Sequence, residues 1–162
     1  VSKSHSMTGW RIGWGIGDPE IIKGMSKIQS QSVSAPSSIS QYAAEAAIKG
    51  KSEYLKDWKK EYERRRNVVC SELSKIKGIE CSVPAGAFYV LPCVKGVIEL
   101  MGEEATDVTL ATYLLDEAHV ATVPGSAFGA PGHLRISYST SIDIVEEAMK
   151  RIAEAIEKLT AG

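Results

Sequence analysis

The sequence predicts an α+β domain that is preceded by a strand and two helices. Three observations lead to this class. Residues 52–77 and 142–159 carry apolar side chains at the three- and four-residue spacing of amphipathic helices. Between these two helices, short apolar runs typical of strands occur beside one further helical pattern. The chain has 162 residues, the length of one domain or of one domain with a piece of another.

The first fifty residues begin with a predicted strand. In residues 10–17 bulky apolar residues alternate with glycine and arginine. Asp18 can then cap a helix whose first residue is Pro19, and apolar residues at helical spacing extend that helix over 19–32. After a Ser/Ala/Pro stretch, a second helix is expected over 39–48.

The long helix over 52–77 marks the expected domain boundary. We therefore assign residues 1–50 to one domain and residues 51–162 to the next. Residues 59–66 of this helix are mostly charged, and acidic and basic side chains lie three or four positions apart. This spacing indicates a solvated helix face rather than a nucleic-acid patch.

The rest of the second domain is predicted to mix strands and helices. Beyond Gly78 the apolar runs become short and turn residues separate them. We expect strands over 79–83, 87–91, 120–123 and 134–139, helices over 106–118 and 142–159, and a loop over 124–131.

The composition excludes several classes of protein. Nineteen lysines and arginines face twenty aspartates and glutamates, so the net charge of −1 gives no general attraction to nucleic acid or an anionic membrane. No apolar run approaches the roughly 18 residues that a membrane span needs, and the first residues do not resemble a signal peptide. We expect a cytoplasmic protein without nucleic-acid or membrane partners.

Cysteine and histidine do not predict a metal site. Cys70, Cys81 and Cys93 share no CxxC spacing and are expected to be buried or partly buried thiols. The three histidines are scattered and share no ligand spacing with cysteines or carboxylates. The aromatic residues Phe88, Tyr89 and Phe128 are more typical of a core than of a cleft.

Arg135 is the candidate that the pattern itself singles out. In the strand expected over 134–139, Leu134, Ile136 and Tyr138 share one face, and Arg135 lies on the opposite, polar face. A structural ion pair is the simplest role for such an arginine. A polar cleft is the alternative, where a guanidinium can bind a carboxylate at two points.

A family resemblance then enters through four motifs in a fixed order. They are Ser2–Gly13 (SKSHSMTGWRIG), Pro84–Tyr89 (PAGAFY), Pro124–Gly129 (PGSAFG) and Leu134–Ser139 (LRISYS). The first closely resembles the lysine signature of the class I aminotransferases that use pyridoxal phosphate, the aspartate aminotransferase family, with arginine eight residues after lysine. The likeness covers nearly the whole chain.

The resemblance implies roles for three residues. Lys3 would bond to the aldehyde of pyridoxal 5'-phosphate and, once substrate displaces it, carry a proton to and from the substrate α-carbon. Arg11 would bind the cofactor phosphate, and Arg135 would bind the substrate α-carboxylate. No metal is implied.

The resemblance also implies that the chain is incomplete. Family members have roughly 400 residues, and the other cofactor-binding groups would lie upstream of Val1. Residues 1–50 would be the end of the large α/β cofactor domain of a fold type I aminotransferase, with apolar surface left exposed, and residues 51–162 would be its small α+β domain. We expect the chain alone to be inactive.

The parent protein would transfer an amino group between an amino acid and a 2-oxo acid. Aspartate and 2-oxoglutarate are the expected pair, and the family implies a homodimer. Two alternatives stay open: a noncatalytic small-domain module for binding or dimerisation, and, within the family, a carbon–sulfur lyase or another amino-acid aminotransferase.

Overall fold

The structure, a computed structural model, describes residues 1–161, with side chains described as far as Leu159. Gly162, the last residue of the domain expected over 51–162, lies outside the described residues. The chain divides into two compact units, Val1–Trp58 and a second that begins at Lys59. The sequence places the boundary at residue 51, and each unit is described by itself below.

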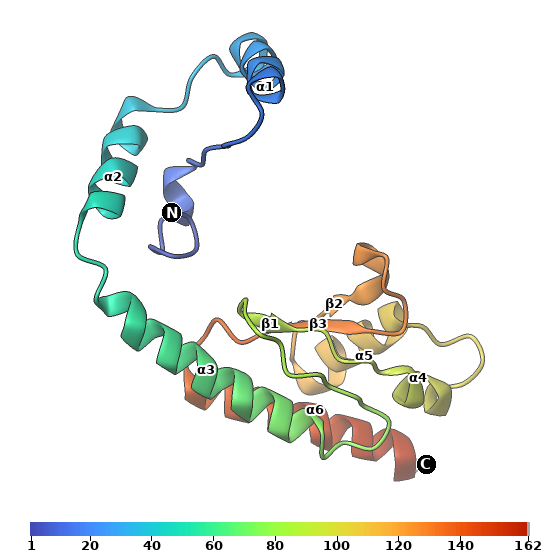
Figure 1. Cartoon of the computed structure of the whole chain (residues 1–162). Helices are drawn as coiled ribbons and strands as arrows, with labels where there is room; N and C mark the ends of the chain where they lie inside the picture. The colour runs from blue at the N-terminus through green and yellow to red at the C-terminus, as the bar shows by residue number, and fades with distance from the viewer. Residues whose placement is uncertain (162) are drawn as a thin grey trace. The chain divides into compact units, whose positions relative to one another are not determined.

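The first unit is helical. It contains a short 3-10 helix, η1 (Thr8–Trp10), then α1 (Pro19–Ser32) and α2 (Ser38–Lys49), both labelled in Figure 1. α1 begins as the sequence predicts, because the Asp18 carboxylate accepts a hydrogen bond of 2.8 Å from the Glu20 N–H. Both helices therefore confirm the prediction, α2 with one more residue at each end.

The strand predicted over residues 10–17 is wrong. Trp10 ends η1, and residues 11–18 have no regular secondary structure. A strand exists only when a neighbouring strand satisfies its backbone N–H and C=O groups, and none of the strands in the described chain lies in the first unit. The apolar alternation is real, but Ile16 is 91% exposed.

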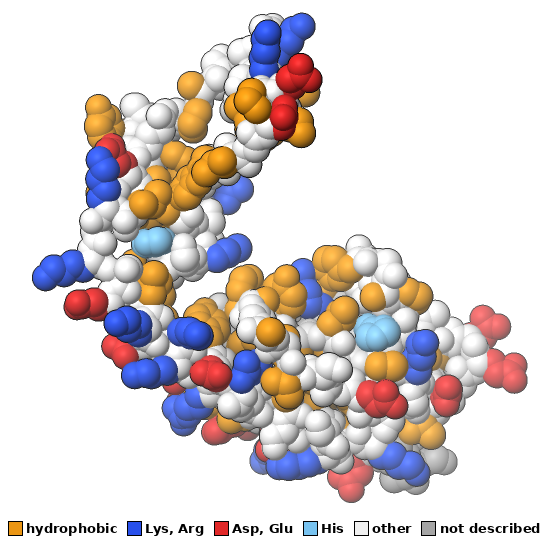
Figure 2. Space-filling view, viewed as in Figure 1, with side chains coloured by type: hydrophobic (Ala, Val, Ile, Leu, Met, Phe, Trp, Pro, Cys, Tyr) orange, Lys and Arg blue, Asp and Glu red, His pale blue; other side chains and the backbone are white. Residues whose placement is uncertain are grey.

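Apolar side chains remain exposed on the first unit. Ser40 and Ala44 are its only buried residues among those described. Figure 2 shows hydrophobic side chains at the surface of this unit. The exposed large residues in this unit are Trp10, Trp14, Ile16, Ile21, Met25, Ile28, Val33, Ile39, Tyr42, Ile48, Tyr54 and Trp58.

The second unit contains the hydrophobic core, to which its four α-helices and the strands β1 and β3 contribute. The core's buried residues run from Val69 in α3 to Ile156 in α6. Around it lie α3 (Tyr54–Leu73), whose first residues belong to the first unit, and then α4 (Lys95–Met101), α5 (Asp107–Ala118) and α6 (Ile142–Ala161). α5 and α6 pack against each other (Figure 1).

A small antiparallel sheet completes the α+β unit. Its strands β1 (Tyr89–Val90), β2 (Val123–Pro124) and β3 (Leu134–Ser137) lie in the order β1-β3-β2. Tyr89 lies opposite Ser137, and Val123 lies opposite Arg135. The predicted α+β class is confirmed, and β3 is its central strand.

Several predicted boundaries in this unit are wrong. The long helix ends at Leu73, because Lys75 and Ile76 donate to carbonyls three residues back and tighten the chain into turns. The strand over 79–83 is a single bridge between Glu80 and Cys93, and the strand over 120–123 is displaced to β2. α4 was not expected, since seven residues give too little periodicity to detect.

The charged stretch on α3 forms the expected ion pairs. Glu61 lies 2.8 Å from Arg65 and 3.6 Å from Arg64, and Glu63 lies 3.3 Å from Arg66. The face is less solvated than predicted, because Arg66 also donates a 3.2 Å hydrogen bond to the Pro84 carbonyl. α3 thereby holds the loop that leads into β1.

The cysteines are free thiols, as predicted. Cys70 is buried, and Cys81 and Cys93 are partly buried. The sulfur atoms of Cys70 and Cys81 lie 3.8 Å apart. Burial, with the neighbouring Cys70, raises the pKa of the Cys81 thiol to about 12.

Candidate functional site

Arg135 lies on the polar face of β3, opposite the face that packs into the core. Leu134, Ile136 and Tyr138 are each at most 5% exposed, whereas Arg135 is only partly buried. The Tyr138 N–H donates to the Phe88 carbonyl at 2.9 Å, which fixes the end of β3 against the start of β1. The predicted two-faced strand is confirmed, and it holds the arginine backbone rigidly.

Two aromatic rings flank the Arg135 guanidinium. Its central carbon lies 4.5 Å from the ring centroid of Phe128 and 5.5 Å from that of Tyr89, both within cation–π range. Phe128 is 53% exposed and Tyr89 is 39% exposed. The expectation of core aromatics is therefore wrong for these two and holds only for Phe88, which packs partly buried against the core.

No described side chain forms an ion pair with this guanidinium. Within residues 1–161, its described contacts are the two rings, and no hydrogen bond or salt bridge to it is found there. A structural ion pair, the simplest role predicted for Arg135, is thus not what the structure shows. A planar cation with unused N–H donors between two aromatic faces suits a carboxylate that binds through two oxygens.

Lys3 and Arg11 lie in the first unit. Lys3 is exposed on a turn in which the His5 N–H donates to the Val1 carbonyl at 3.0 Å. Arg11 directly follows η1 and adopts the left-handed conformation, with φ of 48°. The Arg11 guanidinium donates to the Thr8 carbonyl at 3.1 Å, so the arginine side chain folds back on η1.

These two residues fit part of a pyridoxal phosphate site. Both side chains are exposed, so an incoming aldehyde could reach the amine and an incoming phosphate could reach the guanidinium. This chain therefore supplies an amine and a guanidinium to such a site.

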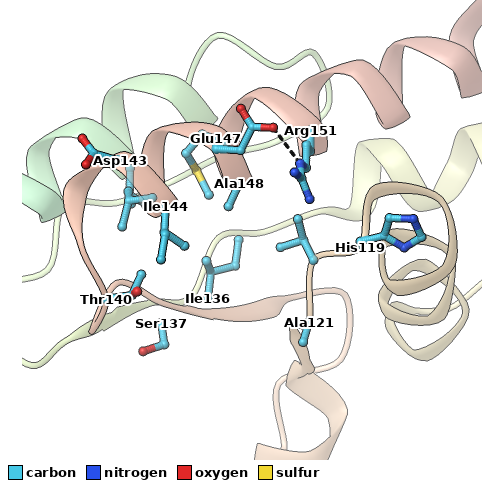
Figure 3. A pocket seen from close by; sticks show the side chains of 14 residues that line it. His119, Ala121, Ile136, Ser137, Thr140, Asp143, Ile144, Glu147, Ala148 and Arg151 are labelled. Carbon is cyan, nitrogen blue, oxygen red and sulfur yellow. Dashed lines mark hydrogen bonds and ion pairs between the residues drawn. The ribbon is translucent and has the colours of Figure 1, made fainter.

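A cavity of about 450 Å³ lies elsewhere in the second unit. Figure 3 shows its apolar lining, which includes Ile136 and Ala148, below a Glu147–Arg151 ion pair of 2.8 Å. That pair lowers the pKa of Glu147, since the Arg151 N–H bonds stabilise its ionised form. Because these charges satisfy each other, the cavity offers less to an anionic ligand than Arg135 does.

The loop that carries Phe128 contains a tight turn that the sequence analysis did not predict. The loop expected over 124–131 contains a 3-10 turn, η2 (Gly125–Phe128), whose Ser126 N–H donates to the buried Asp107 carboxylate at 2.7 Å. Burial alone would raise the pKa of Asp107, but N–H groups of Ser126 and Gly132 hold it below its ordinary value. The small residues around Phe128 were the available signal for this turn.

The described residues lack both a metal-binding cluster and a membrane-spanning helix. They contain no group of three or more histidine, cysteine, aspartate or glutamate side chains that could hold a metal ion. No helix in the described part of the chain is both long and apolar enough to cross a membrane.

The fold and site together define a class of protein. A small α+β unit whose central strand carries a partly buried arginine, with no ion pair to any described side chain, is suited to binding a carboxylate-bearing molecule. Comparison with known sequences then gives the family. The model of the family described as aminotransferase class I and II matches residues 1–152, and the chain belongs to that family, as the motifs predict.

Similar proteins agree with this assignment. The chain is 46% identical to an aspartate aminotransferase of Rhizobium meliloti (strain 1021) over 99% of its own length and 40% of that protein's. It is 47% identical to one from Bacillus subtilis (strain 168), with 98% and 40% coverage. An asparagine–oxo-acid transaminase of Streptococcus mutans is 45% identical, with 98% and 40% coverage.

Solved structures share the fold. The crystal structure of the Rhizobium meliloti aspartate aminotransferase gives a TM-score of 0.88 at 46% identity, over 97% of this chain and 40% of that one. An aromatic aminotransferase from Pyrococcus horikoshii gives 0.87 at 37% identity, over 99% and 42%. The chain thus spans about two fifths of the length of the relatives that it matches.

Proposed function

We propose that this chain is the C-terminal portion of a pyridoxal-phosphate-dependent aminotransferase. The parent protein exchanges an amino group between an amino acid, aspartate in the first instance, and a 2-oxo acid, 2-oxoglutarate. Family membership supports the reaction type, and the names of the aspartate aminotransferase relatives support the substrate. The parent acts as a homodimer, and the chain by itself is inactive.

Within this chain, Arg135 is the main structural support for the proposal. Its guanidinium is held between two rings, and no described side chain competes for its donors. It binds the α-carboxylate that amino acid and 2-oxo acid substrates share. One of the similar solved structures is an aspartate aminotransferase from Thermus thermophilus with maleate, a dicarboxylate.

Lys3 and Arg11 belong to the cofactor half of the proposed site. Pyridoxal phosphate, when bound, supplies the electron sink for the reaction. The Lys3 amine would hold the cofactor and would move a proton at the substrate α-carbon. Arg11 binds the phosphate, for which paired N–H donors are suited.

Residues 1–50 belong to the large domain of the parent protein and residues 51–162 to the small one.

Covalent labelling tests this proposal. The chain is treated with substoichiometric pyridoxal phosphate, reduced with borohydride, and analysed by intact mass and peptide mapping. A single adduct on Lys3, absent from Lys3→Ala and retained in Lys23→Ala, another exposed lysine of the first unit, is the expected result. It would also exclude a noncatalytic module.

Scattered or absent labelling contradicts a cofactor half-site in this chain. Activity is then measured in the full-length parent, with aspartate and 2-oxoglutarate as substrates. A parent with Lys3→Ala that still transfers amino groups would overturn the proposed role of Lys3. Release of sulfide or pyruvate from cysteine, without amino transfer, would favour a carbon–sulfur lyase.

A further inference from the structure

The Phe128 ring stands against Arg135 without support from a core. More than half of the ring is exposed, and yet its centroid lies 4.5 Å from the guanidinium carbon. A buried ring is held by its neighbours, but an exposed ring takes its place from its backbone. The position of Phe128 therefore depends on the turn η2 that carries it.

Several hydrogen bonds fix η2, and three from backbone N–H groups are 2.9 Å or shorter. The Gly125 N–H donates to the His133 carbonyl at 2.8 Å, and the Ala130 N–H donates to the Gly125 carbonyl at 2.9 Å. The third bond is the 2.7 Å contact from the Ser126 N–H to Asp107. The first two lie within the loop itself, whereas Asp107 ties the turn to a different element, α5.

The Asp107 carboxylate is not needed to cap its own helix. The side chain of Thr106 accepts from the Thr109 N–H, and the side chain of Thr109 accepts from the Thr106 N–H, a complete capping box. Asp107 is only 3% exposed, and burying a carboxylate is costly unless donors surround it. Its use is in holding the turn.

We infer that Asp107 is a positioning residue for Arg135. Its carboxylate fixes the Ser126 N–H, the turn then places the Phe128 ring, and the ring orients the guanidinium toward the incoming carboxylate. This inference rests on the proposed function of Arg135 and adds a residue that does not touch the substrate.

The test reads the Arg135 side chain directly by NMR of the 162-residue chain. Protons above an aromatic face resonate upfield, so the Arg135 side-chain resonances in the wild type should lie upfield of those in Phe128→Leu. Asp107→Asn should lose most of that difference. Asp116→Asn, which changes an exposed aspartate on the same helix, should keep it.

The outcomes separate positioning from general destabilisation. The Phe128→Leu background supplies one check, because adding Asp107→Asn there should cause no further shift. If Asp107→Asn does not fold, Asp107→Glu, which keeps the charge but moves the carboxylate by one methylene, should give a reduced upfield shift. A folded Asp107→Asn or Asp107→Glu chain with the full wild-type shift would overturn the inference.

Maleate titration of the same samples keeps this inference distinct from the proposed function. If Arg135 binds carboxylates and Asp107 positions it, the dissociation constant for maleate rises severalfold in Asp107→Asn and not in Asp116→Asn. Unchanged maleate affinity in a folded Asp107→Asn chain contradicts the inference. Suppose instead that maleate does not shift the Arg135 resonances of the wild type, whereas Asp107→Asn does. That result would contradict carboxylate binding by Arg135 but not the positioning role of Asp107.

Discussion

The guanidinium of Arg135 is defined by geometry as much as by charge. Its planar group fits between two rings, and a lysine ammonium at the same place would keep the charge but lose the paired donors and the stacking surface. Recognition of a carboxylate by this chain should therefore be sensitive to a change that conserves charge.

Replacement of Arg135 by lysine is expected to weaken maleate binding by about tenfold, since one charged hydrogen bond contributes roughly 1.5 kcal/mol or more. Arg135→Ala should weaken it further. The measurement is an NMR or calorimetric titration of the chain, with Arg64→Lys as the control, because Arg64 is exposed and paired with Glu61. Equal affinity of the wild type and Arg135→Lys would contradict two-point binding.

The buried Asp107 gives a second residue-scale prediction, which concerns pH. Its pKa is lowered in the folded chain, so its stabilising effect is fully present above the ordinary value of 3.8 and is lost as pH falls through the lower, folded value. At about pH 7, Asp107→Asn should lower the free energy of unfolding by about 2 kcal/mol.

Urea unfolding of the wild type and Asp107→Asn at about pH 7 and about pH 2.5 tests this dependence. The difference in stability between the two chains should shrink at the lower pH, where Asp107 is increasingly protonated. Asp116→Asn should show little difference at either pH. A gap that stays constant would mean that the Asp107 charge does not stabilise the loop.

At the scale of elements, the turn η2 depends on glycine at position 125. A Cβ there would lie 2.2 Å from the Ala130 carbonyl oxygen, an atom of rigid backbone. Gly125→Ala should therefore destabilise the second unit by about 3 kcal/mol, near the upper end for overpacking. Gly86→Ala is the matched control, because nothing lies within 4 Å of its added Cβ.

Urea denaturation followed through the helix signal of the second unit gives that measurement. The Gly125→Ala chain should also weaken the upfield shift of Arg135, since it displaces the turn that carries Phe128. Wild-type stability in Gly125→Ala would show that the turn can move at little cost.

Local sequence predicts the helices well and the strands poorly. α1 and α5 match the sequence closely because capping residues mark their starts: Asp18 and Thr106. The strand expected over 10–17 fails because pairing depends on a distant partner, which no local pattern reports. β1 and β2, of two residues each, are too short for alternation to be detected.

In the candidate site too, the sequence predicts some residues correctly and others not. Alternation along β3 places Arg135 on the polar face, whereas the assignment of Tyr89 and Phe128 to a core overlooked their exposure. The same alternation that buries Val90 turns Tyr89 outward. Asp107 was not identified because its partner, the Ser126 N–H, is nineteen residues away.

At the scale of the whole molecule, the two units differ in how much they bury. The core cluster lies entirely in the second unit, whereas the first buries only Ser40 and Ala44 among its described residues. Local opening is easiest where few apolar contacts are lost. The amides of α1 and α2 should exchange with deuterium faster than those of α5 and α6.

Hydrogen exchange followed by mass spectrometry measures this difference. Peptides that cover Pro19–Ser32 should exchange at a free-energy cost well below that of global unfolding, and peptides from Asp107–Ala118 should approach it. Equal protection in both units would indicate that the apolar surface of the first unit is covered in solution, which a concentration series would reveal as self-association.

The strand order β1-β3-β2 has a consequence for synthesis on the ribosome. β3 is the last strand to be made, and the two earlier strands pair with it rather than with each other. A nascent chain that ends before Leu134 therefore contains both edge strands and no template for either. The sheet of the second unit therefore cannot assemble piece by piece as the chain emerges, and it forms only once β3 has been translated, when α6 is the one helix still to follow among the described residues.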